Sequence, residues 1–196
     1  MRHLPNMNPD RLTEGGYTPL PDEVLDLCRR VGAPPRLLAH LILVHDVARM
    51  LAIRVQTAFP ALNFDKDAVF FGAATHDLGK AIHREELSEP GKLHEFCGVE
   101  LLKEHGVQEN LAHFAYTHGT WNGSQPAQIE DLMVALSDNC WKGKRVPDLE
   151  ALITDALVES TGEPQWKCYA ALDDILQDLT ANADARIEWQ RSFPAH

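Results

Sequence analysis

From Arg36 to about Ala58, apolar residues recur at spacings of three and four, which restricts this part of the chain to a long helix with a buried stripe. Pro34 and Pro35 precede the stretch and Pro60 follows it, as expected where a helix begins and ends. Similar spacing recurs further along the chain, whereas no alternating strand pattern of useful length and no internal repeat is present. The sequence therefore predicts an all-α fold, a single helical bundle of about nine helices.

Turn-forming residues divide the chain into segments. Residues 1–21 are rich in Pro, Asn and Gly and lack periodicity, so we expect an extended N-terminal arm, followed by a single helical domain at residues 22–196. Its motif-bearing part is residues 36–145, and C-terminal helices follow at residues 147–191. The expected helices cover residues 22–30, 36–58, 66–77, 93–105, 107–118, 127–141, 147–159, 164–179 and 184–191, with loops at residues 83–92 and 119–125.

The charge balance excludes some partners. Lys and Arg number 18 against 29 Asp and Glu, a formal charge of −11, which argues against a broad nucleic-acid or acidic-membrane surface. A small anionic substrate would need a local positive site. The N-terminus lacks an apolar signal segment, and the four cysteines form no CxxC pair, so we expect a cytoplasmic protein without a membrane span.

Residues 73–80, Ala-Ala-Thr-His-Asp-Leu-Gly-Lys, place an imidazole, a carboxylate and an ammonium at the end of an apolar helix for which Asp65 is the expected N-cap. Adjacent helical side chains point about 100° apart, so His76 and Asp77 can converge only on something that lies between them. A helix C-terminus alone would explain the glycine, but a buried carboxylate is costly unless it is paired or bound to a metal. The stretch is a candidate metal site.

Other ligands must come from elsewhere in the chain. His40 lies within the apolar stripe of the helix at residues 36–58, where a histidine is either a core residue or a ligand. His45 is the rival, because five residues rotate it by about 140° and only one of the two can reach the same ion. Asp138, in an apolar helix, needs a cation or several donors if it is buried.

Three further groups remain open. His94 begins one expected helix and His118 ends another, and either can be a ligand or an ordinary helix-end residue. The basic cluster Lys142-Gly143-Lys144-Arg145 either extends a positive site toward a second phosphate or is a solvated helix end. In the C-terminal helices, Trp166, Tyr169, Leu172, Ile175, Leu176 and Leu179 recur at helical spacing, as in core packing or a homodimer interface.

Together these residues resemble the HD-domain superfamily of metal-dependent phosphohydrolases, in which a His, a His-Asp pair and a later Asp lie on helices. His40-Leu41-Ile42-Leu43-Val44 is similar to the first motif of that family, residues 73–80 to its signature, and Ala135-Leu136-Ser137-Asp138 to its last motif. The resemblance implies a helical HD-like domain. It also implies that one divalent transition metal, Mn, Fe, Co, Ni or Zn, is held by His40, His76, Asp77 and Asp138.

The family resemblance leaves the number of metal ions open. His94 is similar to the additional histidine of members with two metals, and His118 to their next one. Many of those members have a His-His pair where this chain has His118-Gly119, so one ligand of a second site is missing. We expect one ion, with a second as the alternative.

The activity implied by the resemblance is hydrolysis of a phosphomonoester, a phosphodiester or a nucleotide phosphate bond by metal-activated hydroxide. Asp77 and Lys80 would be catalytic, with Lys80 neutralising charge on the non-bridging phosphoryl oxygens. The partner would be a small phosphorylated compound, with nucleotides among the candidates. The alternatives are a di-iron oxygenase of the same fold, and a non-catalytic module that binds a metal or a nucleotide in regulation.

Overall fold

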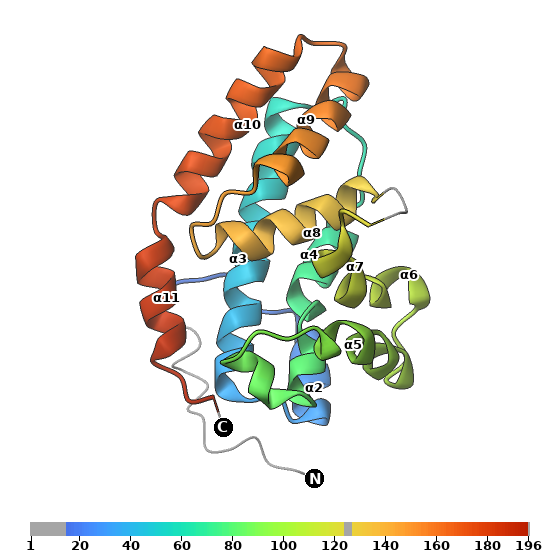
Figure 1. Cartoon of the computed structure of the whole chain (residues 1–196), viewed down its shortest axis with the longest axis vertical. Helices are drawn as coiled ribbons and strands as arrows, with labels where there is room; N and C mark the ends of the chain where they lie inside the picture. The colour runs from blue at the N-terminus through green and yellow to red at the C-terminus, as the bar shows by residue number, and fades with distance from the viewer. Residues whose placement is uncertain (1–14, 124–126, 196) are drawn as a thin grey trace.

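The computed structural model describes residues 15–123 and 127–195, and within these ranges helices are joined by turns and irregular loops, without a strand. The central element is α3 (Pro35–Ala58), which packs against α4 (Lys66–Thr75), α8 (Ile129–Cys140), α10 (Gln165–Thr180) and α11 (Ala183–Arg191) (Figure 1). Because α3 is apolar on most of its circumference, it is stable only when other helices surround it. The all-α prediction is confirmed.

The remaining elements surround this centre. In Figure 1, α9 lies beside α10 at one end of α3, and α5 to α7 lie to one side at the other end. Their bounds are α2 (Asp22–Val31), the 3-10 helices η1 (Leu78–Ala81) and η2 (Arg84–Leu87), α5 (Leu93–Glu104), α6 (Glu109–Ala112), α7 (Phe114–Thr120) and α9 (Pro147–Thr161).

The segment at residues 107–118, expected as one helix, forms α6 and α7, which adjoin at His113. The start is delayed because the amide of Val107 bonds to the carbonyl of Leu102 and so closes the end of α5, with Gly106 at a positive φ of 87°. The expected loop at residues 83–92 contains η2, and the one at residues 119–125 begins after Thr120, with residues 124 and 125 outside the described ranges.

Two apolar clusters form the core, and they meet along α3 and α4. Leu43 and Ala73 belong to the cluster formed with α8, α9 and α10, whereas Leu41 and Ala74 belong to the cluster formed with α2, α5 and α7. His40 and residues 76–77 lie next to this boundary in sequence. Polar side chains there can approach one another from several helices without interrupting either cluster.

The predicted arm at residues 1–21 falls largely on residues 1–14, which lie outside the described ranges. Its described end runs along α3. The backbone amide and the hydroxyl of Thr18 both donate to Asp46 Oδ1, at 3.0 and 2.7 Å, and the ring of Tyr17 packs edge-on against Trp189 of α11. These contacts join the N-terminal and C-terminal parts of the described chain.

Most of the apolar stripe on α10 is core. Leu172, Leu176 and Leu179 are buried, whereas Trp166 and Tyr169 at the start of the helix are exposed. The homodimer interface expected there stays a prediction. Over the ranges that can be described, the helices are too short or too polar to cross a bilayer.

Candidate metal centre

The end of α4 places the His-Asp pair at the boundary between the two apolar clusters. Asp65 caps the helix start, accepting a hydrogen bond from the amide of Ala68 at 3.0 Å, as the sequence predicts. After Thr75 the chain turns into η1, which lies against α5. Any Cβ at position 79 would overlap the carbonyl group of His94, so glycine is required for this close approach.

Four side chains converge from α3, α4, the turn after it, and α8. His40 Nε2 lies 3.2 Å from His76 Nε2, 3.0 Å from Asp77 Oδ2 and 3.5 Å from Asp138 Oδ1. His76 Nε2 lies 3.6 Å from the same oxygens of Asp77 and Asp138. Ligands about 2.1 Å from one ion are separated by about 3.0 to 3.5 Å when they are neighbours in its coordination shell. The atoms of His40, His76 and Asp138 therefore lie close enough together to hold one divalent ion, and Asp77 adjoins both histidines.

Hydrogen bonds to the far side of the imidazoles fix which nitrogen faces the centre. His76 Nδ1 donates to the carbonyl of Ala73 at 2.9 Å, and His118 Nδ1 donates to the carbonyl of Phe114 at 3.1 Å. A carbonyl only accepts, so each neutral ring carries its proton on Nδ1 and leaves an Nε2 lone pair toward Asp77. This is the tautomer that a metal ligand requires.

Asp77 faces a second set of nitrogens with its other oxygen. Asp77 Oδ1 lies 3.1 Å from His94 Nε2 and 3.5 Å from His118 Nε2. It is fully buried, yet among the described residues no donor reaches it in hydrogen-bonding geometry. A buried acceptor without a donor is rare, and a cation satisfies it. The carboxylate can thus serve two neighbouring ions.

Charges around Asp77 shift its pKa and those of its neighbours. Burial alone would raise the pKa of Asp77, but the Lys80 ammonium, 2.6 Å from Oδ2, and the surrounding imidazoles hold that pKa well below its usual range. Burial also opposes protonation of Lys80, yet Asp77 outweighs it and raises the Lys80 pKa. Burial lowers the pKa of His40, and it lowers the pKa of His118 to about 4. These two rings are therefore neutral near pH 7.

Glu86 is a functional residue that the sequence analysis missed. Its carboxylate accepts hydrogen bonds from the backbone amides of Leu93 and His94, at 3.0 and 3.1 Å, and it contacts His94 Nδ1. It therefore both caps α5 and orients the His94 ring, with Nε2 toward Asp77. Nothing in the run Arg84-Glu85-Glu86 distinguishes it in the sequence, because the chain reversal that brings η2 under α5 is a tertiary feature.

The structure shows which of His40 and His45 belongs to the centre. His40 lies in the cluster, whereas the ring of His45 packs edge-on against Phe70 with centroids 6.3 Å apart. Burial and the charge of Arg49 lower the pKa of His45 to about 4. Its ring nitrogens have no hydrogen-bond partner in the described part of the chain, so it behaves as a buried neutral residue.

The centre opens into a cavity of about 470 Å³. Lys142 and Lys144 line it, but Arg145 does not, because it pairs with Glu150 and Asp173 at 2.7 and 2.6 Å. The cavity walls also include Trp121, Trp141, Asn139, Glu95 and, from the motif-free C-terminal part, Gln190. Of the basic cluster, the structure therefore brings only the two lysines to the centre.

Comparison with protein families assigns the chain to one of them. The family model described as HD domain matches residues 37–157, more than half of the chain, and this span contains all six candidate ligands, His40, His76, Asp77, His94, His118 and Asp138. No solved structure matches the chain significantly. The matched span and the convergence of its His and Asp side chains agree with the expected resemblance. The chain belongs to the HD domain family.

Proposed function

We propose that this protein is a metal-dependent phosphohydrolase that acts on a small phosphorylated compound. The observation that carries the proposal is the convergence of two imidazoles and two carboxylates: His40 Nε2 and His76 Nε2 lie 3.0 to 3.6 Å from each other and from the nearest oxygens of Asp77 and Asp138, with Lys80 beside Asp77. Membership of the HD domain family is consistent with metal-dependent hydrolysis. Two histidines and two carboxylates suit Mn, Fe, Co, Ni or Zn rather than Ca.

A divalent cation bound there supplies a Lewis acid and water of lowered pKa. The chain supplies the rest. His40 presents a neutral Nε2 atom, His76 Nε2 faces the same oxygens, and Asp77 is held as a carboxylate by the Lys80 ammonium. Lys80 lies at the cavity wall, where its positive charge stabilises the charge that develops on phosphoryl oxygens. Asp77 and Lys80 are thus the residues we assign to catalysis.

The cavity supports a small anionic substrate. Its volume of about 470 Å³ is in the range of small-molecule sites, and it is too small for a folded macromolecule. Lys142 lies 3.4 Å from Asp138 Oδ2, and Lys144 makes no ion pair with any described side chain. In a chain with a formal charge of −11, these ammonium groups give the cavity the local positive charge that an anion requires. Nucleotides are within this class.

Phosphate release from a panel of phosphomonoesters, phosphodiesters and nucleotides by metal-loaded protein tests the proposal. Wild type should turn over at least one class, and Asp77→Ala should lose both the metal and the activity. Metal content without turnover of any compound would contradict it and favour a binding module in regulation.

A di-iron oxygenase is the second candidate, because Asp77 faces one group of ligands with each of its two oxygens. Oxygen consumption by the iron-loaded protein in the presence of the same compounds distinguishes it. Iron-dependent oxygen uptake without phosphate release would replace the first proposal by this one.

A further inference from the structure

Three side chains outside the metal centre form a series of thiol, imidazole and carboxylate. Cys97 Sγ of α5 lies 3.3 Å from His83 Nε2, and His83 Nδ1 lies 3.3 Å from Glu85 Oε1 of η2. A carboxylate only accepts, so the neutral His83 ring carries its proton on Nδ1, and its Nε2 lone pair faces the Cys97 thiol. A base within hydrogen-bonding reach of a nucleophile, and itself oriented by a third group, is the arrangement of an activated nucleophile.

The pair of Cys97 and His83 is separate from the metal centre. Within the described ranges, two groups of His, Cys, Asp and Glu side chains have ligand atoms close enough to hold an ion, and both belong to the centre described above. Cys97 and His83 are in neither group, and neither residue lines the cavity of the centre. The arrangement therefore favours proton transfer over metal binding, and its chemistry does not depend on the proposed function.

Cys97 differs from the other three cysteines in its exposure. Cys28, Cys140 and Cys168 are fully buried, and burial raises the pKa of Cys28 and of Cys140 to about 12. Buried thiols of this kind stay protonated and are closed to reagents. Cys97 is partly exposed, as is the side chain of His83. A reagent in solution can therefore reach the one thiol that has a base beside it.

The backbone holds the pair together. The amide of His83 donates to the carbonyl of Gly79 at 3.1 Å, so His83 continues directly from η1. A Cβ at Gly79 would lie only 2.9 Å from the amide nitrogen of Gly98, the residue after Cys97. The end of η1 and this turn of α5 are thus in close backbone contact. Cys97 and His83 are brought together by that contact, which does not depend on their own side chains.

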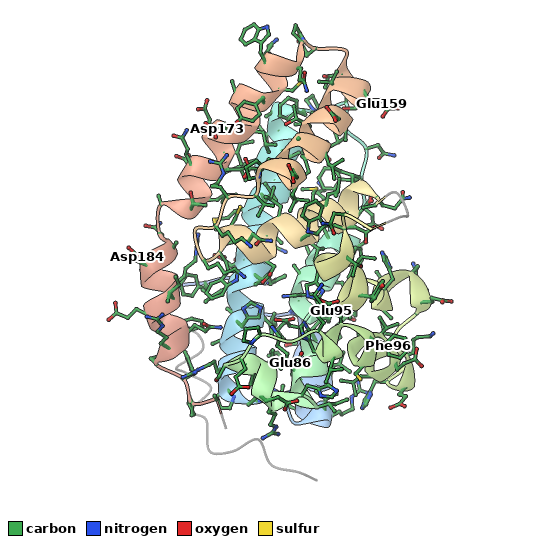
Figure 2. The ribbon with its side chains drawn as sticks, in the orientation of Figure 1. Glu86, Glu95, Phe96, Glu159, Asp173 and Asp184 are labelled. Atoms are coloured by element: carbon green, nitrogen blue, oxygen red, sulfur yellow. The ribbon has the colours of Figure 1, made fainter. Side chains whose placement is uncertain are left out.

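Exposed apolar side chains adjoin the pair. Ile82 precedes His83, Phe96 precedes Cys97, and Leu93 lies one helical turn before Cys97 on α5, with exposed fractions of 55%, 68% and 60%. Figure 2 shows Phe96 on the outer side of α5. The formal charge of −11 disfavours anionic reagents at a surface without a local positive site. A reagent with an uncharged, partly apolar body fits this surface better.

We propose that Cys97 is a modification site for small uncharged disulfides, with His83 as the base and Glu85 as the residue that positions His83. The thiol proton passes to His83 Nε2 as Cys97 Sγ attacks one sulfur of the disulfide. A new S–S bond forms to Cys97 while the bond of the reagent breaks, and His83 returns the proton to the departing thiolate. The products are a mixed disulfide and one free thiol, so no further oxidant is needed.

The test is the rate at which the native protein reacts with 4,4′-dithiodipyridine, an uncharged disulfide that releases a coloured thione. One thiol per chain should react fast, and peptide mass analysis should locate the adduct at Cys97. His83→Gln should lower this rate about 10-fold at pH 7, because an unassisted thiol is only slightly ionised there. At pH 9, where ordinary thiols ionise without a base, the rates of wild type and variant should converge.

Three further variants separate the roles of the neighbouring residues. His105→Gln is the matched control and should leave the rate unchanged, because His105 lies at the other end of α5 with Nδ1 on the carbonyl of Leu101. Glu85→Ala should lower the rate less than His83→Gln does, since it leaves the base in place. Phe96→Ser should slow the reaction with the uncharged reagent but not with anionic 5,5′-dithiobis(2-nitrobenzoate). Thermal unfolding of each variant establishes that it is folded.

Two comparisons can overturn the inference. The first needs no variant: at pH 7, Cys97 of wild type should react faster than N-acetylcysteinamide, and an equal or lower rate contradicts the proposal. The second is an equal rate at pH 7 for wild type and a folded His83→Gln variant, which would remove His83 as the base. Both rates are measured on the thiol, so a failure here leaves the proposed phosphohydrolase function standing, and a protein that releases no phosphate leaves this inference standing.

Discussion

Replacement of Glu86 by Ala tests how far one carboxylate determines the geometry of the centre. Glu86 accepts hydrogen bonds from two amides in the first turn of α5, at 3.0 and 3.1 Å, and it contacts His94 Nδ1. Loss of a helix cap costs about 1 kcal/mol, and loss of a hydrogen bond to a charged group costs about 2 kcal/mol. The sum is about 3 kcal/mol, a fall in Tm of about 6 to 12 °C for a chain of this length.

The same change should weaken metal binding. Without its partner on Nδ1, the His94 ring is free to rotate, so Nε2 no longer stays toward Asp77. Loss of such a partner lowers metal affinity by about 10- to 100-fold. Glu86→Gln should have a smaller effect on Tm, because its amide oxygen still accepts from the backbone, while it retains most of the loss in metal affinity.

Thermal unfolding of the metal-free protein and titration with Co²⁺ or Zn²⁺ measure the two effects separately. The control is Glu85→Ala, a neighbour whose side chain is 59% exposed and, among the described residues, has His83 at 3.3 Å as its polar contact. It should lower the free energy of unfolding by less than about 1 kcal/mol and leave metal affinity unchanged. If Glu86→Ala behaves like Glu85→Ala in both measurements, then Glu86 neither caps α5 nor orients His94.

Three further predictions concern single side chains. Lys80→Met should lower kcat/KM by about 100- to 1000-fold while metal content stays that of wild type, and an unchanged rate would remove Lys80 from catalysis. Burial lowers the pKa of His45 to about 4, whereas in the unfolded chain this ring takes up a proton below about pH 6.5, so the free energy of unfolding falls as the pH drops toward 4. Between pH 8 and pH 5, denaturant unfolding should show that His45→Leu loses about 2 kcal/mol less of this free energy than wild type does. His113 behaves oppositely, because its contact with Asp131 at 2.9 Å raises its pKa. Its contribution to the free energy of unfolding is present below about pH 6.5, is lost as the pH rises through the raised pKa, and stays below about 1 kcal/mol at this partly exposed position. In denaturant unfolding, His113→Gln should therefore destabilise the protein at pH 6 and have no effect at pH 9.

Local patterns determined most of the fold. The spacing of apolar residues along α3, the proline at its start and the Asp65 cap of α4 are all local properties of the chain, and each appears in the structure as predicted. The division of residues 107–118 into α6 and α7 was not predictable in this way. The late start of α6 depends on a backbone bond that closes α5 at Val107, and His113, where α6 and α7 adjoin, contacts Asp131 of α8.

For the centre, the sequence by itself supplied the candidate ligands and their order, because a histidine or an aspartate in an apolar helix is unusual wherever the helix lies. Tertiary structure decided between His40 and His45, since only the packing of α3 against α4 and α8 shows which ring faces Asp77. It also brought in Glu86, which carries no signal in the sequence. Its role arises from distances between helices, and such distances are set by packing rather than by neighbouring residues.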